Sequence, residues 1–245
     1  IRLGLVGSEM CIRDSVNNEW AKNLKFWTFL SWIFLTGGIL LGSIWAYYEL
    51  GWGGFWFWDP VENISLMPWL SLTALLHCVV TLEKRNILKN WTIILSLITF
   101  MLSITGTFLV RSGILNSVHT FANDPTRGIY ILIFLFVLIF ISFIIFFLFE
   151  NKNPEIRKEI FLLSKETSVL INNWFIIYFL TVILVGTIYP IFLDVISSEK
   201  ISVGPPFYNK LILPFLLPFF LFMSIGPSMQ WIKTNFKFKI KYIFY

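Results

Sequence analysis

The sequence has 245 residues, of which 57% are hydrophobic and only 13% are charged. Soluble domains carry about 25% charged residues, so this composition excludes an ordinary soluble domain and indicates a membrane protein. The formal net charge of +5 does not indicate nucleic-acid binding, because no basic run is interleaved with aromatic residues. Basic residues in the loops of membrane proteins instead set the orientation of the chain.

Six apolar stretches are long enough to cross a bilayer, which takes about 20 apolar residues in a helix. They lie near Phe26–Tyr47, Ser65–Leu82, Trp91–Val110, Ile129–Phe149, Trp174–Leu193 and Leu211–Ile232. Each backbone polar group in lipid must be satisfied within its own segment, so we expect helices. The predicted fold class is all-α: a polytopic membrane bundle of about six transmembrane helices.

The chain outside these stretches is short. Residues 1–15 show no periodicity, and the run SEMCIRDS resembles translated adaptor sequence, so we expect them to be non-native or unstructured. Residues 16–232 are predicted to form the bundle, and residues 233–245 a basic cytoplasmic tail. Neither Cys11 nor Cys78 belongs to a C-x-x-C or C-x-x-C-H pattern, which argues against a thiol-redox motif and against a c-type cytochrome.

The cations between the spans are distributed unevenly. One set of segments holds Lys22, Lys25, Lys84, Arg85, Lys89, Lys152, Arg157, Lys158, Lys165, Lys233, Lys237, Lys239 and Lys241, and the opposite set holds Arg111, Arg127, Lys200 and Lys210. The richer set is predicted to face the cytoplasm. Three segments then face outward: the aromatic stretch 45–69 and the loops 111–128 and 194–210.

Two of the predicted helices carry packing signals. The small and polar residues Thr92, Ser96, Thr99, Ser103 and Gly106 recur at spacings of four and three. A stripe of this kind suits close contact between helices in a membrane. The last helix carries Pro214, Pro218 and Pro227, so we expect it to be kinked.

The outward segment 45–69 is unusually aromatic. Nine of its 25 residues are Trp, Tyr or Phe, and no Lys or Arg occurs between Lys25 and Lys84. Gly51, Gly53, Gly54 and Pro60 predict a non-helical surface there, with Asp59 and Glu62 capping a turn or short helix that begins at Pro60. One interpretation is an aromatic belt at the lipid headgroups. The other is a binding surface for a flat apolar macrocycle such as haem, because glycines let backbone approach a flat ligand closely.

The sequence has two histidines, His77 and His119. His119 lies in the outward loop, where its imidazole could ligate iron or cap a turn. His77 lies inside the second span and shares a helix face with Trp69, Thr73 and Thr81. It could face a functional site in the bundle interior, where one of these threonines could orient the ring, or form a hydrogen bond between helices.

Arg111 and Arg127 flank the His119 loop. A guanidinium matches the geometry of a carboxylate such as a haem propionate, and an interfacial arginine can also reach lipid phosphate. We favour the propionate for Arg111 and the lipid for Arg127. No Ser–His–Asp set, phosphate-binding loop or zinc-ligand cluster indicates another chemistry.

Several motifs carry a resemblance to a known family. WGGFWFWDPVEN resembles the tryptophan-rich WWD signature of haem-handling membrane proteins, and its continuation WDPVENISLMPWL resembles the CcmF family of cytochrome c haem lyases. The similarity continues through TGTFLVRSGILNSVHTFANDPTRG, GTIYPIFLD and KISVGPPFYN, and so covers about Trp20 to Trp231 in order. One departure is Phe55, where members of the family often carry Trp.

The resemblance implies a function in cytochrome c maturation. Haem would be held on the periplasmic side and joined through thioether bonds to an apocytochrome c. The protein would then be part of an enzyme, a haem lyase, although the resemblance assigns it no catalytic residue. The implied cofactor-binding residues are His119, His77, Trp45, Trp52, Trp56, Trp58, Trp69 and Arg111. His119 would ligate the iron of the substrate haem, and His77 that of a b-type haem within the bundle.

The resemblance also implies partners and a location. The partners are a CcmE-like haem chaperone, the apocytochrome with CcmH- or CcmI-like thiol-handling subunits, membrane lipid and a quinol. The location is a bacterial inner membrane, with the mitochondrial inner membrane as the alternative. A second outward histidine before Trp20 and a second membrane histidine after Tyr245 are implied too, so we expect the sequence to be a fragment.

Two other functions stay open. A related haem transporter would deliver haem to the chaperone without attaching it to a cytochrome, and the DPVEN and KISVGPPFYN motifs argue against this. A structural membrane subunit with an aromatic belt would need no haem at all. A paralogue dedicated to one cytochrome is not distinguished from a general lyase.

Overall fold

The computed structural model of the chain describes residues 18–51, 54–114, 124–148, 159–197 and 201–234. Its helices are α2 (Asn18–Glu49), α3 (Pro60–Arg85), α4 (Lys89–Ser112), α5 (Pro125–Leu148), α6 (Lys165–Ser197) and α7 (Pro205–Ile225), followed by a 3₁₀ turn, η1 (Gly226–Ser228). All six α-helices are long and apolar enough to cross a membrane. The predicted fold class, an all-α polytopic membrane bundle, is therefore confirmed.

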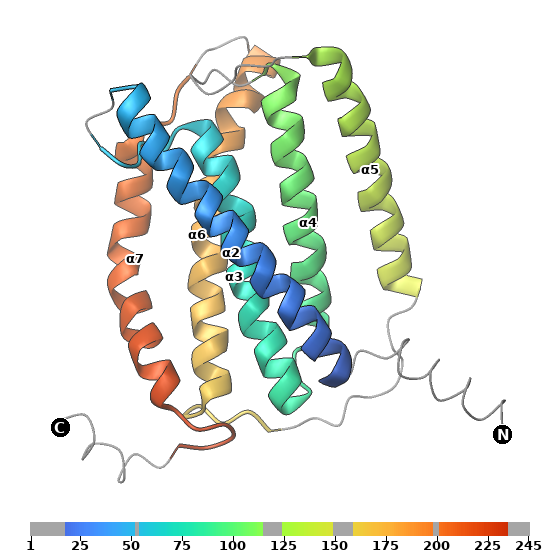
Figure 1. Cartoon of the computed structure of the whole chain (residues 1–245), viewed down its shortest axis with the longest axis vertical. Helices are drawn as coiled ribbons and strands as arrows, with labels where there is room; N and C mark the ends of the chain where they lie inside the picture. The colour runs from blue at the N-terminus through green and yellow to red at the C-terminus, as the bar shows by residue number, and fades with distance from the viewer. Residues whose placement is uncertain (1–17, 52–53, 115–123, 149–158, 198–200, 235–245) are drawn as a thin grey trace.

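Helix α3 is the centre of the bundle (Figure 1). It packs against α2, α4 and α6, while α5 packs against α4 and α7 against α6. The buried core accordingly contains much of α3, including Leu75, Cys78 and Val79, together with Ile176 and Ile183 of α6. Cys78 packs as a small buried side chain, as its position in an apolar span predicts.

The cations of the two predicted sets lie at opposite ends of the bundle. Lys22, Lys25, Lys84, Arg85, Lys89 and Lys165 belong to the helix ends at the bottom of Figure 1, and Arg111, Arg127 and Lys210 to those at the top. This separation is what a consistent membrane orientation requires. Which end faces outward remains a prediction.

A buried ion pair closes the lysine-rich end. The carboxylate of Glu166 in α6, which is 2% exposed, accepts a hydrogen bond of 2.7 Å from Nε of Arg85 at the end of α3. The same carboxylate accepts from the backbone N–H of Ile232 at 3.0 Å. Ile232 has a φ of 77°, an unfavourable conformation for a β-branched residue, and this hydrogen bond helps to hold it.

The aromatic segment 45–69 is less irregular than predicted. Helix α2 continues to Glu49 and α3 begins at Pro60, so the non-helical part is shorter than predicted, and the turn or short helix expected at Pro60 is the start of the long helix α3. Proline breaks a helix only in its interior, whereas at the first position its fixed φ suits helix formation. Asp59 caps α3 in a capping box with Glu62, which confirms the capping role predicted for both residues.

Part of the stripe on α4 makes the predicted close contact with another helix, which is α3. Thr92 is fully buried, and Thr99 shares a hydrogen bond of 2.7 Å with Ser71 of α3. A Cβ atom on Gly106 would lie 2.7 Å from Cγ2 of Ile64, so this glycine permits the close approach of the two helices. Ser103 is the exception, because its side chain is exposed.

The last helix begins earlier than predicted, at Pro205, and ends at Ile225. Pro214 and Pro218 lie inside one continuous helix, and Pro227 lies in the 3₁₀ turn that follows it. The early start brings Tyr208 and Asn209 into the first turn of α7, beside the loop between α2 and α3.

Candidate functional site

Trp58 fixes the loop between α2 and α3 to the start of α7. Its φ is 58°, a left-handed conformation that non-glycine residues adopt only when the surroundings hold them. The indole stacks on the ring of Tyr208, with centroids 4.7 Å apart and planes 12° apart. Its Nε1 donates a hydrogen bond of 3.1 Å to Oδ1 of Asn209. One face and the only polar atom of this indole are therefore used within the protein.

The first turn of α3 holds the backbone of the same loop. Nδ2 of Asn63 donates to the carbonyl oxygen of Trp58 and to the hydroxyl of Tyr208, both at 3.1 Å. Oε2 of Glu62 accepts from the backbone N–H groups of Phe57 at 3.0 Å and Asp59 at 3.2 Å. These polar contacts hold the backbone of residues 57–59 against the first turn of α3.

Trp69 joins α3 to α2 through a reciprocal arrangement. Its indole stacks with Trp32 of α2, with centroids 6.0 Å apart. Nε1 of Trp69 donates to the hydroxyl of Thr36 at 2.8 Å, and Nε1 of Trp32 donates to the hydroxyl of Thr73 at 2.9 Å. Each tryptophan N–H is thus satisfied by a threonine of the opposite helix, as an indole shielded from water requires.

Trp56 and Trp69 lie on the same apolar pocket. The pocket has a volume of about 220 Å³ and is lined by Thr36, Ile39, Leu40, Trp56, Leu66 and Trp69. Most small-molecule sites measure about 300–1,000 Å³, so this pocket can receive part of a large flat ligand and leave the rest outside. Its aromatic and aliphatic lining suits the apolar face of a macrocycle rather than a charged group.

The other predicted site residues are placed as follows. Trp45 lies in the last turns of α2 and is 43% exposed. Trp52 and His119 lie outside the described residues. Arg111 lies in the last turn of α4, and Nε of Arg127 pairs with Asp124 at 3.1 Å. The proposed contacts of these arginines with a propionate and with lipid remain predictions.

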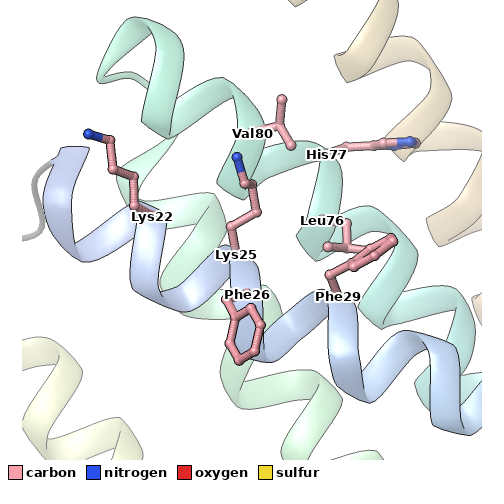
Figure 2. Close-up of a pocket in the computed structure, with 7 residues that line it drawn as sticks. All are labelled: Lys22, Lys25, Phe26, Phe29, Leu76, His77 and Val80. Atoms are coloured by element: carbon pink, nitrogen blue, oxygen red, sulfur yellow. The ribbon is translucent and has the colours of Figure 1, made fainter.

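His77 lies in the middle of α3, and its ring points to α6 (Figure 2). Its Nδ1 is 2.9 Å from Oδ1 of Asn173 in α6. Within the described part of the chain, the other ring nitrogen, Nε2, has no hydrogen-bond partner. An imidazole that ligates haem iron has one nitrogen held by a hydrogen bond and the other open toward the metal. His77 has this arrangement, so it fits a haem.

A second, larger pocket borders the turn of α3 that carries His77. It has a volume of about 490 Å³, and Lys22, Lys25, Phe26 and Phe29 of α2 and Leu76, His77 and Val80 of α3 line it. The ammonium group of Lys25 is paired with Glu83 at 2.6 Å. Figure 2 shows the His77 ring directed away from the two lysines, so the ring and the lysines do not form one polar cluster.

The threonines proposed to orient His77 do not do so. Thr73 accepts from Trp32 and donates to the carbonyl oxygen of Trp69, and Thr81 donates to the backbone carbonyl of His77 itself. The prediction was wrong because it considered only one face of one helix, whereas α6 packs beside the ring. Asn173 was missed, although an asparagine within an apolar span is itself a signal for a functional or packing role.

Tyr208 and Asn209 were noticed only as part of the KISVGPPFYN motif. Nothing in that motif predicts that its tyrosine stacks on Trp58, because the two residues are far apart in the sequence. Among the described residues, no group of three or more His, Cys, Asp or Glu side chains is placed to hold a metal ion.

Comparison with known proteins identifies the family. A family model described as "Cytochrome C assembly protein" matches residues 8–116. CycK of Rhizobium meliloti, a cytochrome c-type biogenesis protein, is 46% identical over 94% of this chain and 35% of its own length. CcmF of Escherichia coli K12 is 44% identical over 88% of this chain and 33% of its own length.

A solved structure agrees with these relatives. A protein titled "Cytochrome c Heme Lyase CcmF" matches with a TM-score of 0.70 and 27% identity, over 92% of this chain and 33% of that protein. The chain spans about a third of the length of the curated relatives that it matches. By its sequence and its fold, the chain belongs to the CcmF family of cytochrome c-type biogenesis proteins.

Proposed function

We propose that this chain forms the haem-holding part of a cytochrome c haem lyase in a bacterial inner membrane. The observation that carries the proposal is the state of His77, a membrane histidine with Nδ1 held by Asn173 and Nε2 open. An ionisable side chain in a membrane helix is costly unless it serves a partner or a ligand. The relatives' names, which specify cytochrome c-type biogenesis, point to haem as that ligand.

The substrate haem belongs at the Trp-rich end of the bundle in this proposal. Trp56 and Trp69 offer the apolar wall of the 220 Å³ pocket, and Trp45 and Trp52 are proposed as further aromatic contacts of the haem. Trp58 contributes differently, because its stack on Tyr208 and its hydrogen bond to Asn209 hold the loop in place. His119 would ligate the iron of this haem, and Arg111 would supply a cation for a propionate.

This part of the protein positions the reactants rather than carrying out bond formation itself. Bound haem would supply the vinyl groups to which the two thiols of an apocytochrome c add, forming thioether bonds. The aromatic pocket excludes water and holds the macrocycle in one orientation, which favours reaction by proximity. A CcmE-like chaperone would deliver the haem, and CcmH- or CcmI-like subunits would present the thiols.

His77 holds a second haem, of b type, within the bundle in this proposal. Its distance from the Trp-rich end along α3, from the turn at Trp69 to that at His77, is about two helical turns. A b-type haem held there by His77 would supply one-electron redox chemistry within the bundle, and a quinol is the proposed source of electrons.

A chimera tests the proposal in cells. This chain replaces the matching third of Escherichia coli CcmF in a strain that lacks the native protein, and mature cytochrome c is measured by its covalently bound haem. We expect His119→Ala and Trp56→Ala to abolish or strongly reduce maturation. Trp27→Ala is the control, because Trp27 is 63% exposed in the opposite half of α2, and maturation should continue. Normal maturation with His119→Ala at normal protein levels would contradict the proposal.

A further inference from the structure

We propose that Asn173 is a positioning residue that fixes the tautomer of His77, placing the proton on Nδ1 and the lone pair on Nε2. The inference about the tautomer stands on the hydrogen bonds of the described residues alone. Its consequence for iron rests on the proposed function, and the two are tested separately below.

The orientation of the Asn173 amide follows from its other contacts. Its Nδ2 lies 3.3 Å from the carbonyl oxygen of Ala74 and 3.2 Å from Sγ of Cys78, both in α3. A carbonyl oxygen only accepts hydrogen bonds, so the atom facing it must be the NH₂ group. Turning the amide over would bring Oδ1 against the oxygen of Ala74. The atom 2.9 Å from Nδ1 of His77 is therefore the amide oxygen.

The amide oxygen then determines where the imidazole proton lies. Oδ1 of Asn173 has no hydrogen to donate, so Nδ1 of His77 must donate. In a neutral ring the other nitrogen, Nε2, carries the lone pair and is the atom free to bind a metal. Asn173 is 3% exposed, so water does not compete for its amide oxygen. In the apolar interior this hydrogen bond therefore strongly favours the tautomer with the proton on Nδ1.

Other polar groups near the ring do not oppose this arrangement. Thr81 donates to the backbone carbonyl of His77 and not to its ring. Cys78, on the next position of α3, accepts from Nδ2 of Asn173. Asn172, the neighbouring residue of α6, is 7% exposed, but no described residue hydrogen-bonds its Oδ1. It lies beside Asn173 in sequence without sharing the contact with His77.

The fixed tautomer gives Asn173 a function beyond packing. A hydrogen bond from Nδ1–H to an amide oxygen orients the ring and makes Nε2 a better electron donor to a metal. Removing such a partner commonly weakens metal binding by about 10- to 100-fold. Asn173 would thereby stabilise the oxidised iron of a haem bound to His77 and set how strongly that haem is held.

The first experiment measures the tautomer without haem. The whole chain, labelled with ¹⁵N-histidine and reconstituted in lipid nanodiscs, is studied by NMR under conditions in which the imidazoles are neutral. The sequence holds two histidines, so a His119→Ala variant assigns the signals of His77. We expect Nδ1 to be protonated and Nε2 to be bare. A protonated Nε2 in the unmodified chain would overturn the proposal directly.

Three variants separate the role of Asn173 from general packing. Asn173→Leu keeps a similar volume but removes the acceptor, and should lower the ratio of the Nδ1–H to the Nε2–H form by roughly tenfold. Asn173→Asp keeps an acceptor oxygen and should retain the Nδ1–H form. Asn172→Leu, the matched control on the same helix, should leave the ratio unchanged. An unchanged ratio in Asn173→Leu would also overturn the proposal.

The second experiment measures the consequence for haem. In the Escherichia coli chimera, Asn173→Leu should raise the reduction potential of the membrane haem and weaken its binding by about tenfold or more. Asn172→Leu should change neither quantity. Absence of haem from the chimera that carries native His77 and Asn173, with the tautomer as predicted, would reject the proposed function and leave the tautomer assignment intact. A fixed tautomer with an unchanged potential in Asn173→Leu would reject the effect on iron.

Discussion

The indole of Trp58 lies flat on the ring of Tyr208, although the two residues come from opposite parts of the chain. The hydroxyl of Tyr208, whose side chain is almost fully buried, accepts a hydrogen bond from Asn63 at 3.1 Å. The stack and the hydrogen bond join the aromatic loop, the first turn of α3 and the first turn of α7. The geometry of the Trp-rich end therefore depends on α7, which lies outside the aromatic segment.

Loss of this contact should destabilise the bundle. Tyr208→Phe keeps the stack but removes the hydroxyl, and should cost about 1 kcal/mol of unfolding free energy. Trp58→Ala removes the stack and the hydrogen bond to Asn209, and should cost about 2 kcal/mol. Thermal unfolding in nanodiscs measures both. Tyr48→Phe is the matched control, because Tyr48 is 76% exposed; equal stability of Tyr48→Phe and Tyr208→Phe would show that the hydroxyl contributes nothing.

The contact between Trp32 and Thr73 should be measurable as a coupling energy. The indole N–H of Trp32 donates to the threonine hydroxyl at 2.9 Å across the α2–α3 interface. Hydrogen bonds between membrane helices contribute about 0.6 kcal/mol on average. A double-mutant cycle with Trp32→Phe and Thr73→Val should give a coupling near this value. Strict additivity of the two substitutions would mean that the hydrogen bond is energetically neutral.

Much of the fold follows from hydropathy because lipid leaves few alternatives. Apolar stretches of about 20 residues must be helical there, and all six were found. The start of α3 was predicted less well, because the apolar span was placed from Ser65 and the turn or short helix expected at Pro60 was not joined to it. The cap formed by Asp59 and Glu62 was predictable, since both residues lie next to that boundary.

The site was predictable only where its contacts are local. The Trp-rich motif identified Trp56 and Trp69, and both line one pocket. The stack of Trp58 on Tyr208 depends on where the loop before α3 meets the start of α7, and the contact of His77 with Asn173 depends on how α3 packs against α6. Periodicity within one helix assigns a face to a residue but not the neighbour on that face, which is why Thr73 and Thr81 were chosen in place of Asn173.

Gly106 should tolerate no side chain, whereas Gly38 should. A Cβ at Gly106 would lie 2.7 Å from Cγ2 of Ile64, while nothing lies within 4 Å of a Cβ at Gly38. Gly106→Ala should therefore destabilise the bundle by about 1–3 kcal/mol through overpacking. Gly38→Ala should be neutral or stabilising, because alanine favours helix more than glycine. Thermal unfolding of the two variants in the same nanodiscs compares them.

The cause of the Gly106 effect can be isolated. Ile64→Ala removes the Cγ2 atom that the new Cβ would meet. The substitution also loses the packing of the Ile64 side chain, so it lowers stability by itself. Gly106→Ala should consequently cost less in the Ile64→Ala background than in the native one. An equal cost in both backgrounds would assign the effect to something other than the contact between α3 and α4.

The role of His77 as a haem ligand is tested most directly by one absorbance measurement. The Escherichia coli chimera that carries this chain is purified with its bound haem, and the reduced-minus-oxidised difference spectrum is recorded with native His77 and with His77→Ala. We expect a b-type signal in the native chimera that is lost or greatly reduced in His77→Ala at equal protein concentration. An identical b-type spectrum in both proteins would contradict the assignment.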